Sequence, residues 1–295
     1  MKIIDLFSKP KPVLSFELFP PKRDGNLENL FQTVLELKEL NPDYMSITYG
    51  AGGSSRDMTY DIAVRLKSLG ILPLMHFTCV GHSREEIHQI LGRIRDAGLE
   101  NILALRGDPP KGQADFKPAP DGFRYAEELI RFIRGEGYGF CLGVAGYPEG
   151  HPESGGLLKD RENMKKKIEA GGQFIVTQLF FDNRDYFYYV DQLRNMGVTT
   201  PVQPGLWLLT DYSQIEKIGS FGTRIPTELY EKLKPLRDDK EYIQRKGIDY
   251  AVKQCAELLE KGAPGIHFYV MNRSAPVREV LSRLKTLGWF KDRTE

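Results

Sequence analysis

The sequence predicts an α/β protein of the (β/α)8 barrel class, formed as one domain over residues 1–295. Three observations predict this fold. Apolar, β-branched or aromatic runs recur eight times, and each is bounded by Pro, Gly, Asn or Asp. Segments with apolar residues at helical spacing lie between these runs. Most runs begin 27 to 37 residues after the previous one, which is the pitch of a barrel with few insertions.

The candidate strands cover residues 13–19, 44–49, 72–80, 101–107, 138–147, 174–181, 201–209 and 265–272. They are apolar almost throughout and alternate with helices, which indicates a parallel sheet whose outer face is covered by helices. The first intervening helix is marked by Leu27, Leu30, Phe31, Val34 and Leu35, and the longest by apolar residues from Ile248 to Leu259. About 64 residues separate the starts of the last two strands, which predicts extra helices at about 210–262.

An open, doubly wound parallel sheet is the alternative fold. Its usual nucleotide-binding signature is missing, because the run from Gly50 to Ser55 lacks the third glycine of G-x-G-x-x-G. The phosphate-binding pattern G-x-x-x-x-G-K-[ST] is also missing from the sequence. The barrel is therefore favoured.

The composition is that of an ordinary globular protein. The chain has 41 basic and 40 acidic side chains, so the basic excess that usually accompanies nucleic-acid binding is missing. The apolar stretches are too short for a membrane helix, and the first residues lack a secretory signal pattern. Cys79, Cys141 and Cys255 lie far apart, which suits reduced buried thiols. We expect a cytoplasmic protein that binds neither nucleic acid nor membrane.

Polar residues gather where the predicted strands end, which is the face of a barrel that carries the chemistry. Glu17 lies between apolar neighbours, and its burial should raise its pKa toward that of a general acid at neutral pH. A Glu on an edge strand, or one paired to a Lys, is the alternative. Gln178 offers a donor and an acceptor that suit a flat heterocycle, or it makes a structural hydrogen bond to a neighbouring strand.

Charged groups mark two further loops. Arg106, Gly107 and Asp108 precede two prolines, which fixes opposite charges at a strand end; a plain Arg–Asp pair is the alternative. Asp160, Asn163 and Lys167 share one helical face, which is ordinarily a solvated face. The five histidines show no metal-binding spacing, and His76 and His267 lie inside strands as core imidazoles would, so we assign no metal.

The strand ends resemble those of methylenetetrahydrofolate reductases. The matching segments are FELFPPK at 16–22, SITYGAGG at 46–53, LALRGDPP at 103–110, AGYPEGHPE at 145–153, TQLFFD at 177–182 and HFYVMNR at 267–273. They occur in the family's order and at suitable spacing over essentially the whole chain. The chain ends soon after the eighth helix, as in the short bacterial type without a regulatory domain.

The resemblance implies a non-covalent FAD at the barrel mouth, with NADH or NADPH and methylenetetrahydrofolate taking turns on it in a ping-pong reaction of one-carbon metabolism and methionine biosynthesis. The residues that match the family's FAD set are Thr48, Tyr49, His76, Arg106, Gly107, Asp108, Tyr125, Ala126, Tyr147, His151, Asp160, Asn163 and Lys167. Within this set, His151 and Lys167 would lie near negative charge. The resemblance also implies a homo-oligomer of two or four chains.

The same resemblance assigns catalytic roles. Glu17 corresponds to the acid that protonates the folate and opens its ring, and Asp108 to the anion that stabilises the resulting positive charge and tunes the flavin. Gln178 and Arg273 would hold the pterin and the glutamate tail. Leu208 and Ile218 depart from the family's pattern, which bears on the choice of electron donor. Two alternatives are a flavin barrel that receives electrons from a partner protein, and a folate-binding methyl or methylene transferase without flavin.

Overall fold

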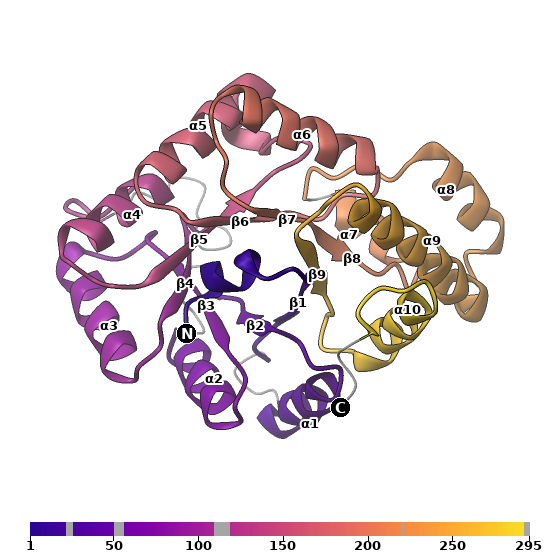
Figure 1. Cartoon of the computed structure of the whole chain (residues 1–295), viewed down its shortest axis with the longest axis horizontal. Helices are drawn as coiled ribbons and strands as arrows, with labels where there is room; N and C mark the ends of the chain where they lie inside the picture. The colour runs from indigo at the N-terminus through magenta and orange to yellow at the C-terminus, as the bar shows by residue number, and fades with distance from the viewer. Residues whose placement is uncertain (22–25, 50–55, 109–118, 220, 292–295) are drawn as a thin grey trace.

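The computed structural model describes residues 1–21, 26–49, 56–108, 119–219 and 221–291. In these residues the strands form one parallel sheet that closes into a ring with helices outside it (Figure 1). The strands are β1 (Val13–Leu18), β2 (Tyr44–Ile47), β3 (Pro73–Thr78), β4 (Asn101–Leu105), β5 (Cys141–Gly146), β6 (Phe174–Thr177), β7 (Val202–Gln203), β8 (Gly205–Trp207) and β9 (Gly265–Tyr269). The predicted α/β barrel is confirmed. The predicted loop from Gly50 to Ser55 and the prolines at 109 and 110 lie outside the described residues.

The order of the strands excludes the doubly wound alternative. Each strand pairs with its neighbour in the sequence, and β1 pairs with both β2 and β9. The seventh barrel strand is divided at Pro204 into β7, which pairs with β6, and β8, which pairs with β9. Proline has no amide hydrogen to continue the ladder, although its carbonyl still accepts a hydrogen bond from the His267 amide.

Helices follow the strands and cover the sheet from outside. They are α1 (Leu27–Lys38), α2 (Arg56–Ser68), α3 (Arg84–Asp96), α4 (Ala126–Gly135), α5 (Leu157–Glu169), α6 (Asn183–Asn195) and α10 (Ser274–Thr286). Their first residues are fixed by local capping: Asn26 caps α1, and Ser83 and Glu86 form a reciprocal capping box at α3.

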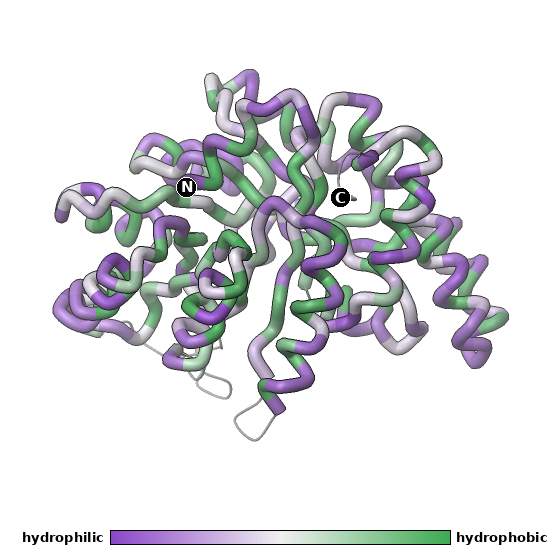
Figure 2. Tube along the Cα trace, turned by 60° about the horizontal axis from the view of Figure 1, so that its bottom comes forward, coloured by the Kyte–Doolittle hydropathy of each residue, from purple (hydrophilic) through white to green (hydrophobic). Residues whose placement is uncertain are grey.

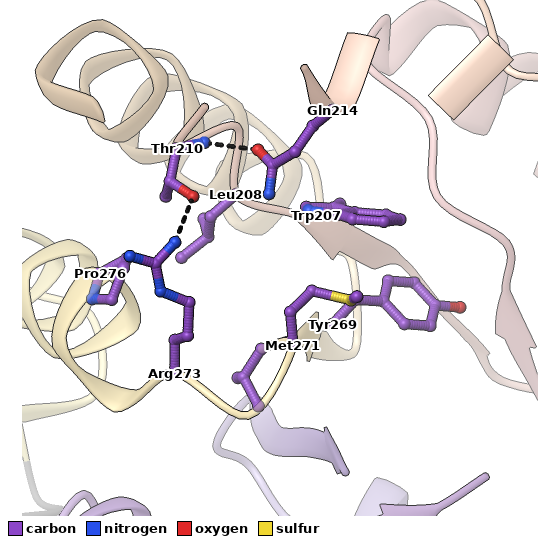
Figure 3. A pocket seen from close by; sticks show the side chains of 9 residues that line it. Trp207, Leu208, Thr210, Gln214, Tyr269, Met271, Arg273 and Pro276 are labelled. Carbon is purple, nitrogen blue, oxygen red and sulfur yellow. Dashed lines mark hydrogen bonds between the residues drawn. The ribbon is translucent and has the colours of Figure 1, made fainter. Parts of the chain in front are cut away.

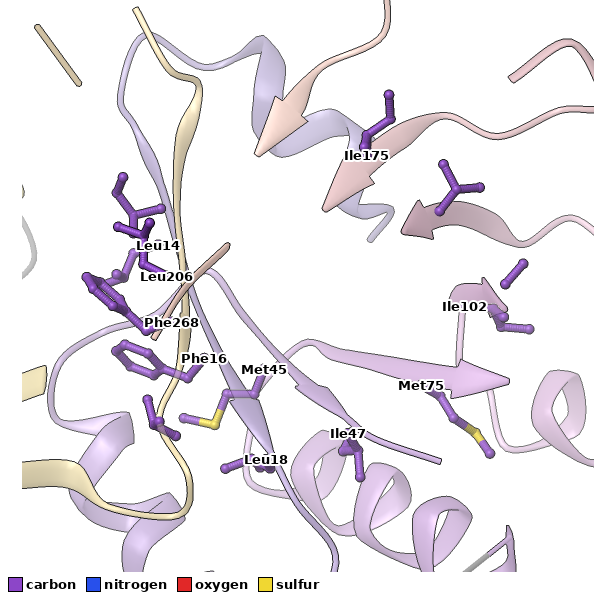
Figure 4. Packing of buried hydrophobic residues seen from close by; sticks show 14 of the residues in the cluster. Leu14, Phe16, Leu18, Met45, Ile47, Met75, Ile102, Ile175, Leu206 and Phe268 are labelled. Carbon is purple, nitrogen blue, oxygen red and sulfur yellow. The ribbon is translucent and has the colours of Figure 1, made fainter. Parts of the chain in front are cut away.

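Alternation along the strands separates two apolar layers. Leu14, Phe16 and Leu18 of β1 pack in a large cluster with helix residues such as Leu30 and Phe31 (Figure 4). The alternate strand positions point into the barrel, where they hold a smaller apolar cluster and polar side chains. Period-two alternation therefore places Ser15 and Glu17 on the inner face of the barrel.

The amino-terminal end of the barrel is closed by a short 3-10 helix, η1 (Ile3–Ser8), which lies across the centre of the ring in Figure 1. Its Ile3 and Leu6 are buried with Val13, at the start of β1. The Ile3 amide also donates to Asn101, at the start of β4. Hydrophobic residues run through the central strands while the outer helix surfaces are largely hydrophilic (Figure 2). The open end is thus the one at which the strands finish.

The predicted extra helices lie between β8 and β9. They are α7 (Gln214–Gly219), α8 (Thr227–Leu233), a 3-10 turn η4 (Lys234–Leu236) and the long α9 (Lys240–Glu260). Trp207, Ile218 and Leu229 share a third apolar cluster that fixes them beside the end of β8. Gly247 of α9 touches the chain there so closely that an added Cβ would lie 1.6 Å from the Leu209 carbonyl oxygen.

Candidate active site

A single carboxylate lies at the centre of the barrel's inner face. Glu17 is 6% exposed, and its Oε2 atom lies 3.2 Å from Nε2 of His76 and 3.3 Å from Nε2 of His267. The Ser46 hydroxyl donates to the same oxygen at 3.2 Å. These groups come from β1, β2, β3 and β9, so the barrel brings together residues that are up to 250 positions apart. Neither a lysine partner nor an edge strand explains Glu17.

The expected rise in the pKa of Glu17 is wrong for the ligand-free chain. Burial does raise it, but the charge of His76 and the hydrogen bond from His267 outweigh burial and hold the pKa at about 2. The sequence could indicate the desolvation of Glu17, but not the two imidazoles that β3 and β9 place against it. Glu17 is therefore an anion in this state.

A chain of buried polar side chains continues from Glu17 into the barrel, and sequence reasoning missed it. His267 Nδ1 lies 2.8 Å from the Ser15 hydroxyl, which accepts a hydrogen bond from the Gln203 amide at 3.0 Å. The Tyr44 hydroxyl donates to the other end of that amide at 2.6 Å. Because β7 is not a neighbour of β1 or β2, these bonds cross the interior. One sequence signal could have indicated this polar chain: side chains alternate between the two faces of a strand, so Ser15 and Glu17 lie on the same face.

Positive side chains gather at the ends of β4 and β5. Arg106 pairs with Glu153 at 2.5 Å, so the simple Arg106–Asp108 pair is not what forms. Lys167 of α5 reaches back to donate to the Ala145 carbonyl at 2.7 Å, and its burial lowers its pKa to about 8. The pKa of His151 is also lowered, by burial and then by the charges of Arg106 and Lys167. Two cationic side chains, Arg106 and Lys167, beside the neutral imidazole of His151 fit a diphosphate.

The other predicted cofactor residues surround this cluster or lie further along the rim. Thr48 and Tyr49 follow β2, Gly107 and the exposed Asp108 follow β4, Tyr147 follows β5, and Tyr125, Ala126 and Asn163 lie on or beside helices. Gly107 has φ +86°, and a Cβ there would lie 2.6 Å from Val80, so only glycine fits. Tyr125 is 61% exposed, which leaves its ring free to contact a ligand.

Both carboxylate oxygens of Asp160 accept hydrogen bonds from groups of the protein itself. Its Oδ1 atom accepts from the His151 amide at 3.2 Å, and its Oδ2 atom accepts from Arg161 at 2.9 Å. Arg161 in turn donates to the Tyr147 and Pro148 carbonyls. Asp160 therefore orders the loop that carries His151, whereas Asn163 on the same helix is exposed.

A pocket opens where β8 and β9 end (Figure 3). Its lining includes Leu208, Thr210, Gln214 and Arg273, and a guanidinium nitrogen of Arg273 donates to the Thr210 hydroxyl at 3.3 Å. Gln214 Oε1 accepts from the Thr210 amide at 2.8 Å, which turns the amide nitrogen of Gln214 the other way. Gln178 follows β6 and caps the Leu179 amide with its own Oε1, outside this lining.

Two departures from the family's pattern are both buried but differ in their surroundings. Leu208 lines the pocket, whereas Ile218 is fully buried in the apolar cluster of the extra helices. Trp207 was not singled out by sequence reasoning, yet it lines the pocket, and its Nε1 atom is buried without a hydrogen-bond partner in the described residues.

Metal-binding clusters and membrane-spanning helices are both absent from the described residues. The part of the chain that the structure describes holds no group of three or more His, Cys, Asp or Glu side chains arranged to bind a metal. Within the same residues, no helix combines the length and apolar character that a membrane span requires. All three cysteines are free and buried, as predicted.

Comparisons with known proteins agree with the resemblance. A sequence model of the family described as methylenetetrahydrofolate reductase matches residues 2–285. The chain is 38% identical over 289 residues to methylenetetrahydrofolate reductase (NADH) 1 of Arabidopsis thaliana. It is 36% identical over 296 residues to methylenetetrahydrofolate reductase 1 of Schizosaccharomyces pombe and 32% over 301 residues to a probable NADPH-type enzyme of Caenorhabditis elegans.

These alignments cover 92%, 97% and 98% of this chain, but 49%, 49% and 44% of the relatives. The chain thus spans about half the length of the curated relatives that it matches. Among solved structures, an uncharacterized Clostridium thermocellum protein described as binding two copies of 5-methyl-5,6,7,8-tetrahydrofolic acid superposes with a TM-score of 0.63 at 14% identity, covering 96% of this chain and 98% of that one. That likeness supports the fold.

The family match covers nearly the whole chain, and the matching motifs lie at the strand ends that build the site. This chain belongs to the methylenetetrahydrofolate reductase family.

Proposed function

We propose that this chain reduces 5,10-methylenetetrahydrofolate to 5-methyltetrahydrofolate with NADH or NADPH, using non-covalent FAD in a ping-pong reaction. The observation that carries the proposal is Glu17, a buried carboxylate flanked by two imidazoles at the centre of a barrel whose rim also presents a cationic cluster. When bound, FAD would supply the hydride transfer that links the two substrates.

Arg106 and Lys167 would hold the diphosphate of FAD, because their charges converge at the ends of β4 and β5, and His151 would add a neutral hydrogen-bonding group beside them. Thr48, Tyr49, His76 and Gly107 would line the flavin, and Tyr125 would contact the adenosine end. Arg273, Thr210 and Gln214 present hydrogen-bond donors around the pocket beyond β9, which suits the carboxylates of the folate tail. Gln178 would contact the pterin.

Glu17 would donate the proton that opens the folate ring. It is ionised in the ligand-free chain, so it must receive a proton before it acts. His76 Nε2 lies 3.2 Å from Oε2, which is close enough for proton transfer to Glu17 without an intervening water. Asp108, at the exposed end of β4, would stabilise the positive charge that then develops on the folate.

The test compares Glu17→Gln with Glu39→Gln, a control at an exposed ion pair with Arg278. Stopped-flow absorbance follows reduction of the flavin by NADH or NADPH and its reoxidation by methylenetetrahydrofolate. We expect Glu17→Gln to keep the first step and to slow the second by about 10² to 10⁴-fold, the range of acid–base contributions. Retained folate reduction would remove Glu17 from the mechanism.

Other outcomes would identify the alternative functions. Wild-type protein that takes up no FAD would favour a flavin-free folate transferase, and flavin that neither nucleotide reduces would favour electron supply by a partner protein. The single-domain organisation of residues 1–295, the cytoplasmic location and the homo-oligomer of two or four chains remain predictions.

A further inference from the structure

We propose that Gln203 fixes His267 as the neutral tautomer protonated on Nε2, so that His267 is a permanent hydrogen-bond donor to Glu17 and His76 is the imidazole that exchanges a proton with it. The kinetic part of this inference rests on the proposed function, whereas the tautomer does not. Gln203 is thus a positioning residue that acts on Glu17 through His267.

The orientation of the Gln203 amide follows from its neighbours. Its Nε2 atom lies 3.3 Å from the Val13 carbonyl oxygen, which can only accept a hydrogen bond. The opposite amide orientation would set two acceptors against each other. Tyr44 completes the arrangement by donating to Oε1 at 2.6 Å.

The orientation of the Ser15 hydroxyl follows in turn. The second hydrogen of the Gln203 amide points to the Ser15 oxygen at 3.0 Å, so that oxygen is an acceptor. The hydroxyl hydrogen of Ser15 has two acceptors within reach, His267 Nδ1 at 2.8 Å and the Tyr44 hydroxyl. Donation to Nδ1 is favoured because a neutral His267 must keep its proton on Nε2 to donate to the Glu17 carboxylate. An Nδ1 atom that accepts a hydrogen bond carries no proton, and the neutral ring therefore carries its proton on Nε2.

The consequence reaches Glu17. His267 Nε2–H donates to Oε2 at 3.3 Å and has no free lone pair with which to take the proton of Glu17 away. His76 Nε2 lies 3.2 Å from the same oxygen and has no hydrogen-bond partner in the described residues, so, unlike His267, it is not held as a donor by a side chain behind it. Ser46 on β2 donates to Oε2, and burial together with the negative charge of Glu17 raises the pKa of Tyr44 and Tyr269, so both face Glu17 as neutral hydroxyls.

Every member of the chain is deeply buried. Ser15, Tyr44, Gln203 and His267 are all 0% exposed, so water does not compete for these bonds. Without the Gln203 amide, His267 would adopt the other neutral tautomer for part of the time, and its Nε2 atom would then have a free lone pair. That lone pair would compete with the substrate for the proton of Glu17.

The experiment measures the tautomer directly by two-bond ¹H–¹⁵N NMR on protein labelled with ¹⁵N-histidine, with His267 assigned by its loss in His267→Gln. Wild type is expected to show a pyrrole-type Nε2 and a pyridine-type Nδ1. Gln203→Met and the milder Tyr44→Phe are expected to give a mixture of tautomers. Gln254→Met is the matched control: it removes another buried amide, which donates to the Phe180 carbonyl, and it should leave the His267 signals unchanged.

Stopped-flow mixing of the reduced enzyme with methylenetetrahydrofolate gives the second measurement. Gln203→Met is expected to slow flavin reoxidation about tenfold, the effect of one hydrogen bond to a charged group, and to leave reduction by pyridine nucleotide unchanged. A wild-type His267 protonated on Nδ1, as would follow if Ser15 donated to Tyr44 instead, would overturn the proposal. An unchanged tautomer in both network variants would also overturn it. Inactivity of every protein with folate would contradict the proposed function but leave the tautomer result intact.

Discussion

Replacing Lys167 by Met is expected to stabilise the cofactor-free protein while weakening its hold on FAD. Burial lowers the pKa of Lys167 from 10.5 to about 8. At about 1.36 kcal/mol per pH unit, this difference corresponds to a cost of roughly 3 kcal/mol for keeping the ammonium charged in the folded chain. The side chain is only partly buried and Met loses the bond to the Ala145 carbonyl, so the expected net gain is about 1 to 2 kcal/mol at pH 7.

The pH dependence follows from the direction of the shift. A folded pKa below the unfolded one means that the unfolded chain binds more protons between about pH 8 and 10.5, so the wild type gains stability over this interval. The advantage of Lys167→Met should be full below pH 8 and should shrink as the pH rises toward 10.5. Urea denaturation of the FAD-free proteins at pH 7 and pH 9.5 measures it.

The affinity of Lys167→Met for FAD is the second measurement, and we expect it to fall although stability rises. Loss of one charge-assisted contact to a phosphate should raise the FAD dissociation constant about 10- to 100-fold, measured by flavin fluorescence. Lys166→Met, an exposed lysine on the same helix, is the control and should change neither quantity. A FAD-free Lys167→Met protein that is less stable than wild type at pH 7, or one with unchanged FAD affinity, would refute the reasoning.

Three further predictions concern other parts of the site. Gly247→Ala should lower the free energy of unfolding by about 2 kcal/mol, because its Cβ would strike the Leu209 carbonyl; urea denaturation measures this, and an unchanged midpoint would contradict the close packing. Glu17→Gln should lose about 2 kcal/mol of stability at pH 7, and the gap to wild type should close as the pH falls from about 4.5 toward 2, since a lowered carboxyl pKa stabilises only above that range; a gap independent of pH would contradict the pKa. Arg273→Gln should raise the KM for methylenetetrahydrofolate about tenfold with a smaller change in kcat, whereas Arg278→Gln, in the helix that follows Arg273, should alter neither in steady-state assays.

The strand and helix pattern could be predicted because it is local. Each predicted strand is present, and the extra helices lie where the long gap before the last strand required them. The division at Pro204 was not predicted, because the apolar pattern predicts one strand over residues 201–209, although a proline inside a strand interrupts its ladder. The strand ends were predicted too long, because helix and loop residues continue the apolar runs beyond the last ladder bond.

The candidate site could be predicted only in part. Residue types at strand ends pointed to Glu17 and Arg106, whereas Lys167, on a helix, was assigned to the cofactor only by the family resemblance. Side-chain partners across the barrel could not be found, because the distance between β7 and β1 depends on ring closure and not on neighbouring residues. For the same reason, sequence reasoning assigned Glu17 the wrong direction of pKa shift and missed Gln203 altogether.

The interruption at Pro204 has a mechanical consequence. At Pro204 the sheet is held by one hydrogen bond from the His267 amide, and the Gly205 amide bonds to the Thr177 side chain in place of a strand backbone, so we expect local opening to be easier here than in the continuous strands. Gln203 immediately precedes Pro204, so local opening there would also weaken the hydrogen bonds by which Gln203 positions His267 next to Glu17. Hydrogen–deuterium exchange should accordingly be faster at the Val202 and Leu206 amides than at those in β4. Flexibility of the barrel at this strand would then affect how well Glu17 is positioned to act as an acid.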